Sequence, residues 1–297
     1  MTNDQESPND KREVSATMVN FSTIFQIAAG TTAGTSHYHA RQNRQDAWWV
    51  ERTPHSISAI VCDGCGDPCS PYSEVGAALG CRLLAHRMCK LVDAGVPLDE
   101  AVEQTRLDTL AHLRVLAQSM GDLEDVVRHY FLFTAVGALI TKQEAIFFSI
   151  GDGLVAVNDR LHMIGPYPDN APPYLAYALL PCHGAEARRF KVHARVPTSE
   201  LDRFLLGTDG AAPLLEKSLT VPGKEEAAGG LDHWWREDLY YHNSAALSNR
   251  LRLLSTDRHR IDWQARRKIT DWGRLEDDVT LIVGRRVPLE ELADGNE

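Results

Sequence analysis

The sequence lacks any apolar run long enough to cross a membrane, and it lacks an excess of positive charge. No stretch approaches the roughly 20 consecutive apolar residues that a membrane-spanning helix requires, so we expect no membrane partner. The 297 residues carry a formal net charge of -10, which repels nucleic-acid phosphates and anionic lipids at long range. We therefore expect no broad affinity for nucleic acid, although this composition allows a local basic patch.

Cysteine is too scarce and too unevenly placed for a framework of disulfides. The chain has 6 cysteines, and four of them lie in one short segment, at Cys62, Cys65, Cys69 and Cys81. Small secreted proteins that depend on disulfides have denser and more evenly spread cysteines. The first 17 residues also lack the apolar core that is typical of a secretion signal. These absences predict reduced thiols and a cytoplasmic location.

The composition that remains is typical of a soluble domain with a sizeable core. Hydrophobic residues make up 43% of the chain and charged residues 24%. Polar segments over residues 1–17 and 289–297 are expected to be tails. No internal repeat and no change in composition divides the chain between them, so we predict one domain over residues 18–288.

Hydrophobic periodicity predicts strands, two long helices, further strands, and finally a helix and a strand. The first helix is expected to begin at Ser70 and Pro71, where the hydroxyl can cap free amides and the proline presets φ. Val75, Leu79 and Leu83 recur at intervals of four and are expected on its buried face. A second helix is expected over residues 98–120, with Leu110 and Leu113 on its buried face. The remaining predictions are strands over 21–32, 55–62, 131–141, 144–158, 160–165, 188–196, 203–209 and 276–286, and a helix over 243–255. This order indicates an α+β domain with largely antiparallel sheets.

One local pattern recurs at the ends of the predicted strands. Asp63, Asp152 and Asp209 each follow an apolar run and each precede a glycine, while Asp277 and Asp278 stand directly before the apolar run VTLIV. Asp-Gly is the commonest hairpin turn, so one instance alone would carry little weight. If all these strand ends converge, mutual repulsion raises the pKa values of the carboxyls unless a cation neutralises them. Oxygen ligands favour Mg²⁺ or Mn²⁺ over zinc.

Asp46 and Arg41 extend this pattern towards a phosphate substrate. Asp46 precedes a run that contains two tryptophans, and Arg41 lies five residues before it. The planar guanidinium of arginine can bind two phosphate oxygens at once. An arginine close to a metal cluster therefore favours a phosphate ester as the substrate.

The order of these motifs resembles that of the type 2C metal-dependent protein phosphatases, in particular their divergent bacterial branch. The chain has R-x-x-x-x-D at 41–46, D-G at 63–64, G-D at 151–152, T-D-G at 208–210 and D-D-V-T at 277–280. The resemblance covers about residues 30–283. It implies a four-layer α-β-β-α sandwich of two mainly antiparallel sheets flanked by helices. It also implies hydrolysis of phosphoserine and phosphothreonine with Mn²⁺ or Mg²⁺.

The resemblance implies a metal-binding role for each matched acidic position. Asp63 is similar to the carboxylate that bridges two ions, and the backbone carbonyl of Gly64 is a further ligand. Asp209 and Asp277 resemble ligands of one ion, and Asp46 resembles a carboxylate that holds the other ion through water. Asp152 is similar to the aspartate of a third, weaker metal site.

The same resemblance implies a mechanism and partners. A hydroxide that bridges the two ions attacks the phosphorus directly, and the metals and Arg41 offset charge on the phosphoryl oxygens, without a covalent intermediate. The implied partner is a phosphoprotein, either the target of a Ser/Thr kinase or such a kinase itself. We expect a monomer.

Three positions depart from the family pattern and keep other functions open. Gln45 stands where an acidic pair is common, Cys65 where a histidine is common, and Leu154 where an arginine is common. These changes are compatible with a catalytically weak or inactive phosphatase-like module that binds or regulates a partner. An enzyme that hydrolyses a small phosphate ester would share the same site.

The cysteines and two histidines offer competing sites. Cys62, Cys65 and Cys69 could hold zinc or an iron–sulfur cluster together with Cys81 or His86. We favour structural cysteines, because thiols in apolar strands usually pack as small hydrophobes. His37 and His39 would lie on one face if their segment were a strand, and we favour a surface or supporting role for both.

Overall fold

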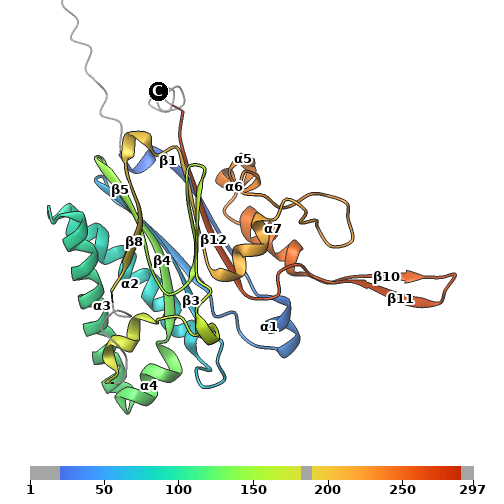
Figure 1. Cartoon of the computed structure of the whole chain (residues 1–297), viewed down its shortest axis with the longest axis horizontal. Coiled ribbons are helices and arrows are strands. Elements are labelled where there is room, and N and C mark those ends of the chain that lie inside the picture. Colours follow the sequence, from blue (N-terminus) through green and yellow to red (C-terminus); the bar gives the residue numbers. More distant parts are fainter. Residues whose placement is uncertain (1–20, 182–188, 289–297) are drawn as a thin grey trace, which may run out of the picture.

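The computed structural model describes residues 21–181 and 189–288, and the predicted tails at 1–17 and 289–297 lie outside this part. Two five-stranded sheets lie face to face, with helices on both outer sides (Figure 1). The predicted four-layer α-β-β-α sandwich is confirmed. Among the described helices, none combines the length and apolar character needed to cross a bilayer.

Every neighbouring pair of strands in the two sheets is antiparallel. The first sheet has, in spatial order, β1 (Phe25–Thr32), β12 (Val279–Arg286), β9 (Arg203–Gly207), β6 (Gly153–Val157) and β7 (Arg160–Ile164). The second sheet has β2 (Ala47–Arg52), β3 (Ser56–Gly64), β4 (Phe133–Thr141), β5 (Glu144–Ile150) and β8 (Lys191–Pro197). Each sheet therefore joins strands that are far apart in the sequence.

Helices cover the outer face of each sheet. Those over the second sheet are α2 (Ser73–Asp93), α3 (Leu98–Met120) and α4 (Leu123–Tyr130). Those over the first sheet are α5 (His233–Arg236), α6 (Asp238–His242) and α7 (Ala246–Ser255). The short helix α1 (Thr35–Ala40) follows β1 at one end of the sandwich (Figure 1).

Three hydrophobic layers hold the sandwich together. Phe147 and Phe204 are fully buried between the two sheets. Leu84 and Leu113 are buried between the second sheet and its helices, and Trp234 is buried against the first sheet. Each such side chain contributes roughly 1.5–3 kcal/mol relative to an exposed position.

The structure corrects the predicted start and buried face of α2. Ser70 does not cap the helix, because its hydroxyl donates to the carbonyl of Arg128, and the helix begins at Ser73. Val75, expected on the buried face, is 44% exposed. The buried face instead includes Gly76, where a Cβ would overlap the backbone of Tyr130 at the end of α4, and Gly80, where it would overlap the ring of Phe133 in β4. Small residues let the helix approach the sheet closely, and a pattern based on large apolar residues misses them.

The predicted strand over 144–158 is two strands in different sheets. The chain crosses between the sheets at Gly151, Asp152 and Gly153. Both glycines have positive φ, 84° and 131°, a conformation that residues with a Cβ rarely adopt. The crossing places Asp152 between the two sheets rather than at a hairpin turn.

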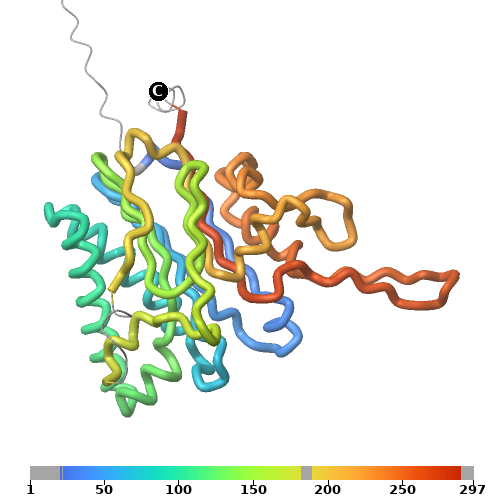
Figure 2. The backbone as a smooth tube through the Cα atoms, viewed as in Figure 1, coloured from blue at the N-terminus to red at the C-terminus, as the bar shows by residue number. Residues whose placement is uncertain are grey.

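A hairpin that the sequence patterns did not predict projects from the body of the molecule (Figure 2). Its strands, β10 (Arg258–Asp262) and β11 (Arg267–Asp271), form a two-stranded sheet of their own. Both strands are rich in charged residues. No alternation of apolar and polar residues therefore marked them as strands.

Candidate active site

Aspartates from separate strand ends meet at one end of the sandwich. Asp63 lies near the end of β3, Asp209 lies two residues after β9, and Asp277 lies two residues before β12. Together with Asp152, these residues line a cavity of about 80 Å³, here called the acidic cavity. The structure thus brings together these four aspartates, and Gly64, also singled out by the sequence, lines the same cavity.

Burial and mutual repulsion raise the pKa values of the carboxyls around this cavity. Burial, followed by the charges of Asp46 and Asp209, raises the pKa of Asp63 well above its ordinary value. Burial, followed by the charge of Asp278, raises the pKa of Asp46 to about 7. Burial, followed by the charge of Asp209, raises the pKa of Asp152 to about 6. A cation between these groups would stabilise their ionised forms.

Two buried carboxylate oxygens show that the residues fit such a cation. Asp46 is only 3% exposed and Asp152 only 6%. Within the described part of the chain, Oδ1 of each has no hydrogen-bond partner. A buried polar atom without a partner is costly, and such atoms are rare in folded proteins. Hard divalent cations take oxygen ligands of this kind, so the donor set fits Mn²⁺ or Mg²⁺.

Other residues hold these carboxylates in position. Thr208 Oγ1 donates to Asp46 Oδ2 at 2.7 Å and accepts from the backbone N–H of Thr280 at 3.0 Å. Asp278 accepts from the backbone N–H groups of Gly34, at 3.0 Å, and Gln45. These bonds join the starts of α1, β2 and β12 around the cavity.

Comparison with known proteins agrees with this geometry. The family model described as protein phosphatase 2C matches residues 33–252. The chain belongs to the protein phosphatase 2C family. No curated protein sequence matches the chain significantly.

Solved structures of phosphatases share the fold. The chain is similar to a serine-threonine phosphatase 2C from Toxoplasma gondii, with 13% identity, 89% of this chain and 95% of that chain covered, and a TM-score of 0.53. It is also similar to a bacterial serine phosphatase that carries a point mutation, with 14% identity, 89% and 99% coverage and a TM-score of 0.50. At these identities the likeness concerns the fold alone.

Gln45, which departs from the phosphatase 2C pattern, has a defined structural role. It lines the acidic cavity. Its side-chain amide donates to the carbonyl of Cys65 at 3.1 Å and to Ser73 Oγ at 2.8 Å. A carboxylate at this position could donate neither bond.

The two histidines lie on a helix rather than on a strand, so their rings point in different directions. His37 lines the acidic cavity, with Nδ1 2.9 Å from Asp278 Oδ2. His39 lies at the outer side of α1, with Nε2 3.0 Å from Asp257 Oδ2. In the described residues, His37, Asp277 and Asp278 are the one set of three whose ligand atoms all lie within 4.8 Å of one another. Asp63 also lies within hydrogen-bond reach of Asp46 and of Asp209, but no three of these described carboxyls have ligand atoms all this close together.

Arg41 lies near this site but outside the lining of the acidic cavity. It is the C-cap of α1, with φ 57°, and its side chain is exposed. Neither the acidic cavity nor the groove beside it includes Arg41 among its lining residues in the described chain. Its phosphate-binding role stays a prediction.

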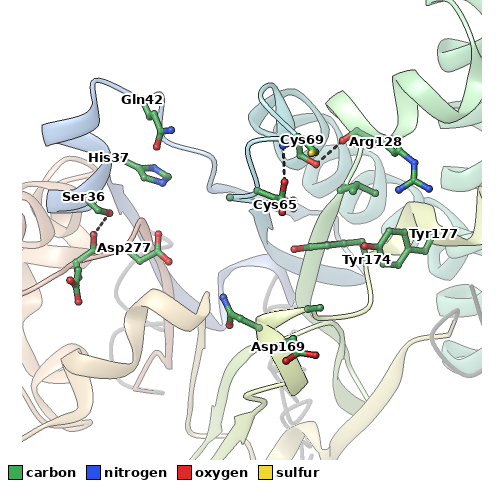
Figure 3. A pocket seen from close by; sticks show the side chains of 17 residues that line it. Ser36, His37, Gln42, Cys65, Cys69, Arg128, Asp169, Tyr174, Tyr177 and Asp277 are labelled. Atoms are coloured by element: carbon green, nitrogen blue, oxygen red, sulfur yellow. Dashed lines mark hydrogen bonds between the residues drawn. The ribbon is translucent and has the colours of Figure 1, made fainter.

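A groove of about 1000 Å³ opens beside the acidic cavity, and the two share lining residues. His37 and Asp277 lie on one side of this groove, and Arg128, Tyr174 and Tyr177 lie on the other (Figure 3). Arg128 Nη2 also forms an ion pair with Glu124 Oε1 at 2.7 Å. The groove is of the size that binds small ligands and short peptide segments.

Part of this groove comes from the loop that follows β7. Asp169, Asn170 and Tyr174, in the proline-rich stretch after β7, line it. Asn170 and Tyr174 also line the acidic cavity. Their proline neighbours indicate a loop, but nothing in the local sequence shows which way that loop folds.

In the described part of the chain, the cysteines do not form a competing metal site. Cys62 and Cys81 are buried in the core, and Cys65 is buried beside them, whereas Cys69 is exposed. Burial, followed by a hydrogen bond with Cys81, raises the pKa of the Cys62 thiol well above its ordinary value. No described set of three metal-binding side chains includes a cysteine. These thiols therefore pack mainly as small hydrophobic groups.

Proposed function

We propose that this chain is a metal-dependent serine/threonine phosphoprotein phosphatase whose reaction takes place at the acidic cavity. The observation that carries the proposal is the convergence of Asp63, Asp209 and Asp277 on one small cavity. The unpartnered oxygens of Asp46 and Asp152 support it. The phosphatase 2C family is metal-dependent and acts on phosphoproteins.

In this proposal, Asp63, Asp209 and Asp277 hold Mn²⁺ or Mg²⁺ ions together with the backbone carbonyl of Gly64. Asp46 would support one of these ions, and Asp152 would belong to a third, weaker site. Bound ions would lower the pKa of a water molecule and place positive charge beside the phosphoryl oxygens.

The protein itself contributes position and orientation. Thr208 fixes the orientation of the Asp46 carboxylate, and Asp278 fixes the backbone of Gly34 and Gln45. The groove beside the cavity receives the residues that flank the phosphorylated side chain, and Arg41 binds the phosphoryl group. Water attacks the phosphorus directly, so no side chain of the cavity has to act as a nucleophile.

The proposal is tested by hydrolysis of p-nitrophenyl phosphate and of a phosphothreonine peptide. We expect turnover with Mn²⁺ that EDTA removes. Asp63→Asn and Asp209→Asn should each lower the rate at least about 100-fold, since each removes a charged metal ligand. Asp202→Asn, at an exposed aspartate before β9, is the matched control and should keep the rate. A folded wild-type protein without EDTA-sensitive turnover would refute the proposal.

A second candidate function is a phosphatase-like module that binds or regulates a partner without catalysis. Gln45, which uses its amide to bind Cys65 and Ser73, and Cys65 in the usual place of a histidine favour it. Calorimetric titration with Mn²⁺ distinguishes the two functions. A module that has lost its ions gives no heat of binding, whereas the enzyme gives a saturable one.

A further inference from the structure

The hairpin of β10 and β11 pairs with no other described strand. It pairs within itself, from Arg258 opposite Asp271 to Asp262 opposite Arg267, and it extends away from the sandwich (Figure 1). A two-stranded hairpin alone is only marginally stable in water. We call residues 257–272 the arm.

Large apolar side chains are exposed along the whole arm. Trp263, in the turn at its tip, is 82% exposed, and Ile261 on β10 is 55% exposed. At the base, Trp272 is 60% exposed, and Tyr38 of α1 is 78% exposed. Exposed tryptophan side chains at both ends of one element are unfavourable in water and are typical of an interaction surface.

The arm is basic, whereas the rest of the chain is acidic. The arm contains five Lys and Arg and three Asp, a net charge of +2, so the rest of the chain carries -12. Some of these charges are compensated within or beside the arm. Arg267 Nε lies 3.9 Å from Asp262 Oδ2, and Asp271 Oδ1 forms an ion pair with Arg274 Nη1 at 2.8 Å. Arg258, Arg260, Arg266 and Lys268 form no ion pair with any described residue. These cations are therefore available to an acidic partner.

Apolar and basic side chains mix on both faces of the arm, because Ile261 and Lys268 form a pair on one face and Arg260 and Ile269 form a pair on the other. The register pairs His259 with Thr270 and Ile261 with Lys268, and directly paired residues of antiparallel strands point to the same side. The bond of 3.1 Å between His259 Nδ1 and Thr270 Oγ1 is consistent with this. Such a face complements a partner whose carboxylates lie next to apolar side chains.

The base of the arm lies close to the proposed catalytic cavity. The rings of His39 and Trp272 are 6.1 Å apart, and His39 Nε2 lies 3.0 Å from Asp257 Oδ2. His37, two residues earlier on the same helix, lines the acidic cavity. Successive residues of a helix rise by about 1.5 Å. Little more than the width of α1 therefore separates the base of the arm at His39 from the acidic cavity at His37.

We propose that the arm is a docking surface for the acidic phosphoprotein substrate, which it holds beside the acidic cavity. This inference rests on the proposed phosphatase function. A protein partner fits better than nucleic acid or a membrane, because the apolar side chains run from base to tip. A long anionic polymer or a bilayer along that whole length would also meet the acidic remainder of the chain.

Phosphorylated casein, an acidic phosphoprotein, is the probe, and p-nitrophenyl phosphate is the small substrate. The triple variant Arg260→Glu, Arg266→Glu, Lys268→Glu and the single variant Trp263→Ser should each raise KM for casein at least about tenfold. Their kcat, their hydrolysis of p-nitrophenyl phosphate and their circular dichroism should match the wild type. The charge-conserving variant Arg260→Lys, Arg266→Lys, Lys268→Arg is the matched control and should keep the wild-type KM.

Binding of labelled casein in EDTA tests the arm without catalysis. We expect binding that is at least about tenfold weaker in the arm variants and that weakens with salt, since exposed charges are screened. If catalysis fails but this arm-dependent binding is found, the docking inference stands and the proposed function fails. Equal casein binding by wild type and arm variants overturns the inference, as does no binding by the wild type. Arm-dependent binding to duplex DNA or to phosphatidylserine vesicles, with casein binding unaffected by the variants, also overturns it.

Discussion

The carboxyls of the acidic cavity influence one another's protonation, so the stability of the metal-free protein should depend on pH. Asp46 has its pKa raised from 3.8 to about 7. Between these values the folded state binds more protons than the unfolded state, so stability is lost as pH rises. His193 has the opposite effect, because burial lowers its pKa from 6.5 to about 4. Between these values the folded state binds fewer protons than the unfolded state, so stability is gained as pH rises. A matched variant is needed to separate the two effects.

Asp46→Asn provides that comparison, since its amide oxygen can still accept from Thr208. In EDTA, the free energy of unfolding of the wild type should fall relative to Asp46→Asn as pH rises from 5 to 7.5. The change should be on the order of 3 kcal/mol, and Mn²⁺ should reduce it. Urea unfolding at several pH values measures it, and a constant difference between the two proteins would contradict the pKa described for Asp46.

Gln45→Glu restores the residue that the family pattern would place here, yet the structure predicts a loss of stability. The new carboxylate would face the carbonyl of Cys65 and lose two donated hydrogen bonds. We expect destabilisation by roughly 1–3 kcal/mol, measured by urea unfolding in EDTA. A variant as stable as the wild type would show that these bonds contribute little.

Residue patterns predicted the acidic cavity better than its surroundings. Asp63 and Asp209 could be found because an aspartate followed by glycine at the end of an apolar run is visible locally. The roles of Asn170 and Tyr174 could not, because they depend on how a loop folds over the strand ends. The role of Gln45 depends on which acceptors its side-chain amide reaches, and its residue type alone does not reveal them.

Among the elements, α2 shows how close packing can oppose intrinsic helix propensity. Gly80 faces the ring of Phe133, which an added Cβ would overlap. Helix propensity alone predicts that Gly80→Ala stabilises the protein by about 1 kcal/mol. We expect the opposite, destabilisation by about 1–3 kcal/mol from overpacking.

Urea unfolding of Gly80→Ala tests this, with Ala78→Gly at an exposed position of α2 as the control. The control should lose about 1 kcal/mol, as propensity requires. An increase in stability for Gly80→Ala would mean that α2 can move away from β4 at little cost.

Elements with a strong apolar pattern were predicted well, and those without one were not. The helix expected over 98–120 has those bounds in the structure. The arm and α1 were missed because their exposed residues carry no amphipathic period, and α4 (Leu123–Tyr130) was missed although it has a buried face, because it spans only 8 residues. The strand expected over 144–158 was wrong, since only the positive φ values of two glycines reveal that it passes from one sheet to the other.

At the scale of the whole molecule, the function depends on the topology of the two sheets. The order of motifs along the chain was enough to indicate the phosphatase 2C family and its sandwich. It could not show that one end of each of β3, β9 and β12 lies at the same cavity, because β3 lies in a different sheet from β9 and β12. The arrangement of the two sheets therefore brings aspartates that are far apart in the sequence into one site.

Crystals grown with Mn²⁺ test this central claim most directly, since anomalous scattering locates manganese independently of the refined structure. The account predicts peaks inside the acidic cavity, within coordination distance of Asp63, Asp209 and Asp277, and their loss in Asp63→Asn. Manganese bound only elsewhere, or an acidic cavity that contains none at saturating Mn²⁺, would contradict it.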